Sequence, residues 1–176
     1  RRAAAGAGDG RAAVILPKKF HNNILNDSKQ LRESQRNELR LLIEQEAIAF
    51  GVGIVDNVRI DVVNILQATY LAMHAAVDQL HAKPELLLID GNRFRPYPGI
   101  RHQCIIKGDA TYLEIAAASV LAKTYRDAIM LQLHSEHPQY NWSRNKGYPT
   151  IEHRQAIRQH GACTYHRHSF RLLKAE

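Results

Sequence analysis

The segment Leu86-Leu87-Leu88-Ile89-Asp90-Gly91-Asn92 runs from four consecutive apolar residues directly into a carboxylate and a glycine. A short apolar run that ends in turn-forming residues is typical of a buried strand. The segment Gln103-Cys104-Ile105-Ile106 repeats this arrangement and stops at Lys107-Gly108-Asp109. Because buried strands of this kind lie in sheets covered by helices, the two segments predict a single domain of the α/β or α+β class.

Working outward from these strands, the apolar pattern predicts further elements. Residues 12–16 and 51–55 are typical of strands, and glycines at 51 and 53 indicate a strand that another backbone approaches closely. Apolar residues at steps of three and four predict a helix from Val63 to Leu80, whose apolar stripe we interpret as core packing. Helices are also predicted over 39–50, after residue 111 and over 150–161, whereas residues 1–11 lack periodicity and should be irregular.

The composition is that of a globular protein, with 176 residues, 45% of them hydrophobic and 23% charged. No apolar run approaches the roughly 20 residues that cross a bilayer, and the Ala/Gly-rich start has no apolar core of a signal peptide. The two cysteines, Cys104 and Cys163, form no CxxC motif, which excludes a disulfide scaffold and a cysteine-based zinc site. We therefore expect a reduced, cytoplasmic protein without membrane association.

Most of the formal net charge of +7 lies in the last quarter of the chain, since residues 138–176 hold seven basic and two acidic residues. Aromatic residues are interleaved with these charges, at Tyr140, Trp142, Tyr148, Tyr165 and Phe170. Cationic and aromatic side chains together suit a nucleic acid, although a solvated basic helical surface explains the composition equally well. Four histidines in the same region, at 153, 160, 166 and 168, lack the spacing of a zinc site, which favours a phosphate-facing or surface position for them.

Asp90 and Asp109 each follow an apolar strand, and each is adjacent to a glycine that allows the backbone to turn. Carboxylates at the ends of neighbouring strands can converge on one sheet edge, where oxygen ligands suit a hard divalent cation. One such aspartate alone is more often a turn former or helix cap, but the pair makes the two interpretations about equal.

A series of motifs along the chain closely resembles bacterial ribonuclease HII, the type 2 ribonuclease H. The motifs, in the order in which the family has them, are Leu25–Leu31 (LNDSKQL), Gly51–Val55 (GVGIV), Asn64–Thr69 (NILQAT), Ile89–Arg93 (IDGNR), Lys107–Asp109 (KGD), Ile115–Lys123 with Arg126-Asp127, Lys146–Thr150 (KGYPT) and His166–Phe170 (HRHSF). The match extends from about residue 12 to the C-terminus.

The resemblance implies a ribonuclease H-like fold, a mixed five-stranded sheet flanked by helices. Residues 1–11 would be an irregular segment, 12–137 the catalytic core, and 138–176 a basic helical segment of the same domain. The family cleaves the RNA strand of RNA–DNA hybrids and cuts 5′ to ribonucleotides embedded in duplex DNA, in DNA replication and repair. A monomer with Mg²⁺ or Mn²⁺ on four carboxylates is therefore expected, with Asp90 and Asp109 as two catalytic metal ligands.

The resemblance also implies substrate-binding residues. Tyr148 matches the tyrosine that stacks under the ribose at the RNA–DNA junction. Lys107, Lys123, Arg126 and Lys146 are candidates for contacts with phosphates. For Lys123 and Arg126, an ion pair with Glu114 or Asp127 on the helix surface is an equally good interpretation.

The chain departs from the family at its start, where the motif Asp-Glu-Ala-Gly-Arg-Gly, with the other two carboxylates, is absent. Its arginine would fall near Arg2, and Asp9 is too close to the strand at Ala12 to replace its acids. We expect the sheet to lack its central strand, with an incomplete N-terminus as the explanation. Besides a metal-dependent endoribonuclease, the chain could therefore be a catalytically impaired hybrid-binding fragment or a non-functional one with impaired folding.

Overall fold

The computed structural model describes residues 8–25, 31–170 and 172–173, which form two compact units. The strand unit contains residues 10–54 and 69–124, and the C-terminal unit contains the described residues of 1–9, 55–68 and 125–176. The helix α4 (Leu113–Glu136) contributes residues to both units. The last part of the chain therefore groups with residues 55–68 and 125–137.

Each of the four segments that the sequence predicts as strands forms one. These are β1 (Asp9–Ile15), β2 (Ala49–Val55), β3 (Leu86–Asp90) and β4 (Arg101–Ile105). β1 begins three residues before the expected start at Ala12, so residues 9–11 are extended and paired and the prediction of an irregular segment is wrong for them. Residues 1–7 lie outside the described part.

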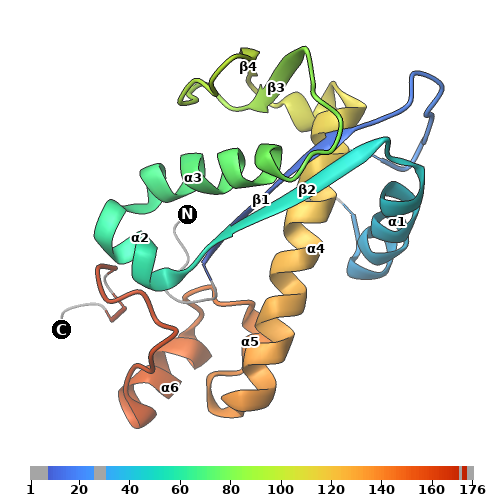
Figure 1. Cartoon of the computed structure of the whole chain (residues 1–176). Helices are drawn as coiled ribbons and strands as arrows, with labels where there is room; N and C mark the ends of the chain where they lie inside the picture. The colour runs from blue at the N-terminus through green and yellow to red at the C-terminus, as the bar shows by residue number, and fades with distance from the viewer. Residues whose placement is uncertain (1–7, 26–30, 171, 174–176) are drawn as a thin grey trace. The chain divides into compact units, whose positions relative to one another are not determined.

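The strands form two separate pairs, as Figure 1 shows. β3 and β4 are parallel, with Leu86 opposite Arg101 and Asp90 opposite Ile105. In the other pair, Ile48 N–H donates to the Ile15 carbonyl at 2.9 Å and Gly8 lies against Val55, so β1 and β2 run in opposite directions. Within the described residues the strands form these two pairs, and no fifth strand joins them.

Helix α3 (Ile65–Asp78) lies along β2 (Figure 1). Its residues Ala72 and Ala76 are fully buried, and a Cβ added at Gly53 would lie 2.0 Å from the carbonyl oxygen of Ala72. A Cβ at Gly51 would lie 2.2 Å from the carbonyl oxygen of Ala76. The expectation that another backbone approaches this glycine strand closely is confirmed, and that backbone is α3.

The larger apolar side chains of the predicted stripe pack against β3 and not against β2. Met73, Val77 and Leu80 contact Leu87 and Ile89 of β3. Leu66, which belongs to the same predicted stripe, is 45% exposed. The helix therefore has two apolar faces, one of alanines toward β2 and one of larger side chains toward β3.

The predicted single helix from Val63 to Leu80 does not form. The helical conformation is interrupted between α2 (Asn57–Val63) and α3. Asn64 at the break has a φ of +68°. Its side-chain oxygen accepts hydrogen bonds from the N–H groups of Leu66 and Gln67, at 3.0 and 3.2 Å. Asparagine tolerates left-handed backbone and caps helices, which is the physical reason for the break.

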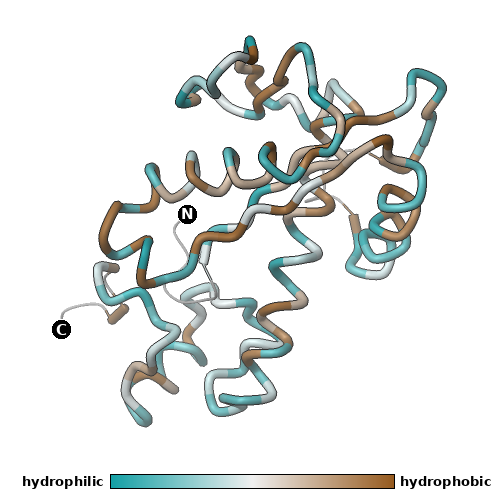
Figure 2. The backbone as a smooth tube through the Cα atoms, viewed as in Figure 1, coloured by the Kyte–Doolittle hydropathy of each residue, from teal (hydrophilic) through white to brown (hydrophobic). Residues whose placement is uncertain are grey.

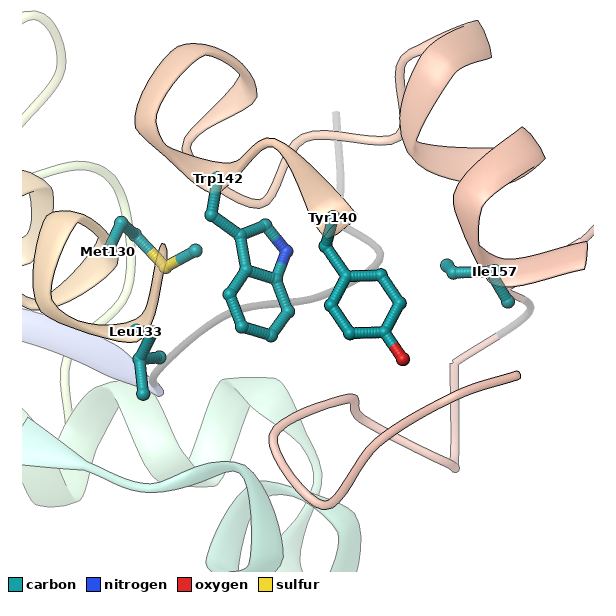
Figure 3. Packing of buried hydrophobic residues seen from close by; sticks show 5 residues of the cluster. All are labelled: Met130, Leu133, Tyr140, Trp142 and Ile157. Atoms are coloured by element: carbon teal, nitrogen blue, oxygen red, sulfur yellow. The ribbon is translucent and has the colours of Figure 1, made fainter. Parts of the chain in front are cut away.

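The remaining helices are α1 (Glu33–Glu46), α5 (Trp142–Asn145) and α6 (Ile151–His160), with 3-10 turns η1 (Gly108–Ala110) and η2 (Pro138–Tyr140). The core of the C-terminal unit is the cluster in Figure 3, formed by Met130, Leu133, Tyr140, Trp142 and Ile157. Figure 2 shows α6 as mainly hydrophilic, which fits a helix that lies at the surface and buries one face.

Candidate active site

The two aspartates that the sequence singles out lie at one end of the parallel pair β3–β4. Asp90 is the last residue of β3, and Asp109 lies in η1, which follows β4. A carboxylate oxygen of Asp90 accepts the N–H of Gly108 at 3.0 Å, so the residue next to Asp109 is tied to Asp90. Parallel strands bring their carboxyl ends to the same edge, which is why residues 19 positions apart in sequence both lie there.

The turn between β4 and Asp109 lies close to α4. Lys107, the residue directly before η1, has a left-handed φ of +57°. A Cβ at Gly108 would lie 2.5 Å from the Cδ1 atom of Ile115 on α4. Gly108 therefore allows the amide that Asp90 accepts to come close to the start of α4, and Asp109 is buried there while Asp90 is exposed.

The carboxylates of Asp90 and Asp109 could supply part of the ligand set of a divalent cation. Carboxylate oxygens are the ligands that Mg²⁺ and Mn²⁺ prefer, and Mg²⁺ is often held by one or two carboxylates together with substrate phosphates. Among the residues that the structure describes, no group of three or more His, Cys, Asp or Glu side chains could hold a metal ion. Asp90 and Asp109 thus fit a cation that also takes oxygen ligands from water and substrate.

Tyr148 lies in the C-terminal unit, in a tight turn that follows α5. Lys146 and Gly147 both have positive φ values, of +48° and +77°. The side-chain amide of Asn145 donates to the Tyr140 carbonyl at 2.7 Å, and its oxygen accepts the N–H of Gly147 at 2.9 Å. The turn is therefore held by a buried asparagine, and it leaves the side chain of Tyr148 43% exposed.

The four basic candidates have different surroundings. Lys107 is exposed beside the carboxylates, and Lys123 is half-buried on α4. Lys146 is buried, with 8% of its surface exposed. Arg126 donates to the Lys146 carbonyl at 3.0 Å, and its Cζ atom lies 5.1 Å from the centre of the Tyr148 ring. Residues 26–30 of the LNDSKQL motif lie outside the described residues.

Several side chains that the sequence suggested for nucleic-acid contact are buried instead. Tyr140 and Trp142 stack with ring centres 5.0 Å apart inside the core cluster. His153 and His166 are fully buried beside them, so their expected phosphate-facing or surface position is wrong. The spacing of His153 and Ile157, four residues apart on one face of α6, is a pattern that could have indicated burial.

The hydrogen bonds of this buried pair define which nitrogens carry protons. The Tyr148 carbonyl can only accept, so Nδ1 of His153 donates to it, at 3.0 Å, and Nε2 accepts from Trp142 Nε1, at 3.2 Å. Nδ1 of His166 accepts the N–H of Cys163 at 3.0 Å, so the proton of His166 is on Nε2, which lies 3.3 Å from His153 Nε2. Both imidazoles are neutral in this arrangement.

Burial lowers the pKa of both histidines, and for His166 burial and the neighbouring His153 lower the pKa to about 4. An unfolded histidine has a pKa of about 6.5. Unfolding therefore takes up protons as the pH falls from about 6.5 toward 4, and the free energy of unfolding should decrease by up to about 1.4 kcal/mol per pH unit for each proton. Urea denaturation at pH 7, 6 and 5 measures this slope.

The variant His166→Asn should flatten the slope, because its amide oxygen can accept the Cys163 N–H without titrating. His160→Asn, an exposed position on α6, is the matched control and should retain the wild-type slope. Equal slopes for His166→Asn and the wild type would show that the buried pair does not cause the pH dependence.

Solved structures identify the class of protein to which this fold belongs. The chain superposes on ribonuclease H2 from Pyrococcus horikoshii with a TM-score of 0.74 at 21% identity, covering 98% of this chain and 91% of that one. The ribonuclease HII of the PCNA:RNase HII complex from Archaeoglobus fulgidus gives a TM-score of 0.67 at 21% identity, covering 86% and 81%. The fold is that of the type 2 ribonucleases H.

Sequence comparison assigns the family. The family model "Ribonuclease HII" matches residues 11–173. Proteins named ribonuclease HII are 62% identical in Bacteroides thetaiotaomicron, over 92% of this chain and 81% of that protein, and 57% identical in Christiangramia forsetii, over 92% and 82%. The chain belongs to the ribonuclease HII family. It is thus a metal-dependent nuclease of the ribonuclease H type.

Among the described residues, none of the helices combines the length and the apolar character that a membrane-spanning helix requires.

Proposed function

We propose that this chain cuts the RNA strand of RNA–DNA hybrids and incises duplex DNA 5′ to an embedded ribonucleotide. The observation that supports the proposal is that Asp90, at the end of β3, accepts the N–H of Gly108, the residue next to Asp109. Two carboxylates at a strand-end edge suit phosphodiester hydrolysis supported by a divalent cation. The role would be the removal of ribonucleotides during DNA replication and repair, by a monomer.

In the proposed reaction a water oxygen bonds to phosphorus while the bond from phosphorus to the 3′ oxygen breaks. The 3′ oxygen takes up a proton, which leaves a 3′-hydroxyl on one side and a 5′-phosphate on the ribonucleotide. Asp90 and Asp109 would hold Mg²⁺ or Mn²⁺, which supplies charge stabilisation and lowers the pKa of bound water. Lys107, on the turn before Asp109, would face a phosphate next to the cut.

Tyr148 is the proposed contact to the ribose, because its ring is exposed on a turn that the Asn145 side chain holds by a hydrogen bond. The 2′-hydroxyl is the feature that distinguishes a ribonucleotide from its neighbours in duplex DNA. Lys123 and Lys146 complete the proposed substrate-binding set. Arg126, the remaining basic candidate, contacts the Lys146 carbonyl and the Tyr148 ring.

The test is cleavage of three duplexes of equal length: an RNA–DNA hybrid, a DNA duplex with one ribonucleotide, and an all-DNA duplex. With Mn²⁺ or Mg²⁺, we expect cuts in the first two, with a 5′-phosphate on the ribonucleotide, and none in the third. Cutting of all three at similar rates would contradict the proposal, as would failure to cut the hybrid.

A second candidate function is hybrid binding with little cleavage. It is favoured by the pair of carboxylates where the family resemblance implies four, and by the lack of a three-residue metal group within the described residues. This alternative predicts salt-dependent binding to the hybrid, no metal-dependent cutting, and no effect of Asp90→Asn on binding.

A further inference from the structure

The side chain of Arg126 contacts the Tyr148 turn at two points. Its Nη2 atom donates to the carbonyl of Lys146 at 3.0 Å, and its guanidinium lies over the Tyr148 ring, 5.1 Å from the ring centre. Arg126 lies on α4 and is itself half-buried. A guanidinium that is committed to a carbonyl and to an aromatic ring has little freedom left to follow a mobile phosphate.

The backbone of Tyr148 is fixed independently of Arg126. Its carbonyl accepts hydrogen bonds from the N–H of Thr150, at 2.8 Å, and from Nδ1 of His153, at 3.0 Å. His153 is fully buried and is held in turn by Trp142 and His166. The remaining freedom of Tyr148 is therefore the rotation of its exposed ring, and Arg126 is the side chain that covers one side of it.

Arg126 also binds the turn at Lys146, two residues before Tyr148. Lys146 is not glycine, yet its φ is +48°, in a region where residues with a Cβ are uncommon. Arg126 binds the carbonyl of this residue, so it restrains the turn where its backbone is least favourable.

We propose that Arg126 is a positioning residue, which holds the ring of Tyr148 in the orientation that stacks on the sugar of a ribonucleotide, and is not a phosphate contact. The inference deepens the proposed function, on which its substrate part rests. Orienting the ring before the substrate arrives lowers the entropy cost of stacking, because the ring has fewer rotamers to lose on binding.

The variants Arg126→Lys and Arg126→Gln separate the two roles. A lysine retains the charge but loses the planar group with its several donors, so it would preserve a phosphate contact and not the two-point support. We expect both variants to weaken binding of the single-ribonucleotide duplex by about fivefold to tenfold, within the range known for base–aromatic stacking. Arg59→Lys and Arg59→Gln, at an exposed position of α2, are the matched controls.

Binding measured in EDTA at several salt concentrations gives the decisive comparison. If Arg126 positions Tyr148, Arg126→Gln should leave the salt slope unchanged, and neither variant should weaken binding further when Tyr148 is already alanine. A wild-type affinity for Arg126→Lys would overturn the inference. So would a salt dependence of binding that, for Arg126→Gln, corresponds to about one released counterion fewer than in the wild type.

A measurement on the free protein distinguishes this inference from the proposed function. With ¹³C-labelled tyrosine, NMR relaxation should show a more mobile Tyr148 ring in Arg126→Lys than in the wild type or in Arg59→Lys. Equal ring mobility would overturn the positioning role. A more mobile ring in a protein whose wild type binds all-DNA and ribonucleotide duplexes equally would retain the positioning role and refute the proposed function of Tyr148.

Discussion

Replacing Asp90 with asparagine is expected to lower the rate of RNA-strand cleavage by about a hundredfold or more. A divalent cation held by carboxylates contributes several kcal/mol to the stabilisation of charge in the transition state, and about 1.4 kcal/mol corresponds to a factor of ten in rate. Asparagine has the same shape as aspartate, so its side-chain oxygen can still accept the Gly108 N–H that the Asp90 carboxylate accepts. The loss should therefore reflect charge and not folding.

The cleavage rate of the hybrid, measured over a series of Mn²⁺ concentrations, tests this prediction, and the concentration that gives half of the maximal rate should rise in Asp90→Asn. Asp78→Asn is the control, because Asp78 is an exposed acceptor of a single hydrogen bond, from Tyr97, in the same unit. Binding of the hybrid in EDTA should be similar for both variants. An Asp90→Asn protein that cuts at the wild-type rate would exclude this carboxylate from the site.

Replacing Gly53 with alanine is expected to destabilise the protein by about 3 kcal/mol, at the upper end of the usual cost of overpacking. The new Cβ would lie 2.0 Å from the carbonyl oxygen of Ala72 and 2.8 Å from the backbone nitrogen of Ala76. Both atoms belong to the backbone of α3, so no side-chain rotation can relieve the contact. The helix has to move away from β2, and the buried alanine face loses its packing.

Urea denaturation at neutral pH measures this change, and Gly10→Ala on β1 is the matched control. A Cβ at Gly10 meets one atom within 4 Å, the Ala122 carbonyl oxygen at 3.8 Å, which is an ordinary contact. Gly10→Ala should therefore change stability by no more than about 1 kcal/mol, and it can be stabilising because alanine restricts the unfolded chain. Similar midpoints for the two variants would mean that α3 does not rest on β2 at Gly53.

Local patterns predicted much of the strand unit correctly. The apolar runs before Asp90 and Lys107 form the parallel pair β3–β4, because uninterrupted apolar segments and turn residues act within a few positions. The glycines at 51 and 53 predicted a close backbone contact, since glycine in a strand often marks a position that another backbone approaches. The placement of Asp90 and Asp109 at one edge followed from those strands.

Local sequence patterns did not predict where the α2 and α3 helices divide or which aromatic side chains are buried. Periodicity could not separate α2 from α3, because the break depends on one asparagine that adopts a positive φ. Charge and aromatic content suggested a nucleic-acid surface over the whole of residues 138–176, yet Trp142 and His153 are core residues. Composition counts side chains without regard to the direction in which they point, so it could not separate Tyr148 from the buried aromatics.

The amino-acid sequence by itself determined the family, the strand segments and the two candidate carboxylates, because these depend on residue types within short stretches of chain. Only the tertiary structure decided which side chains surround Tyr148. Arg126 reaches the carbonyl of Lys146 across 20 positions, and His153 pairs with His166 across 13. Such contacts depend on how distant segments pack, and burial then sets both the charge state of the histidines and the part of the aromatic segment that remains exposed.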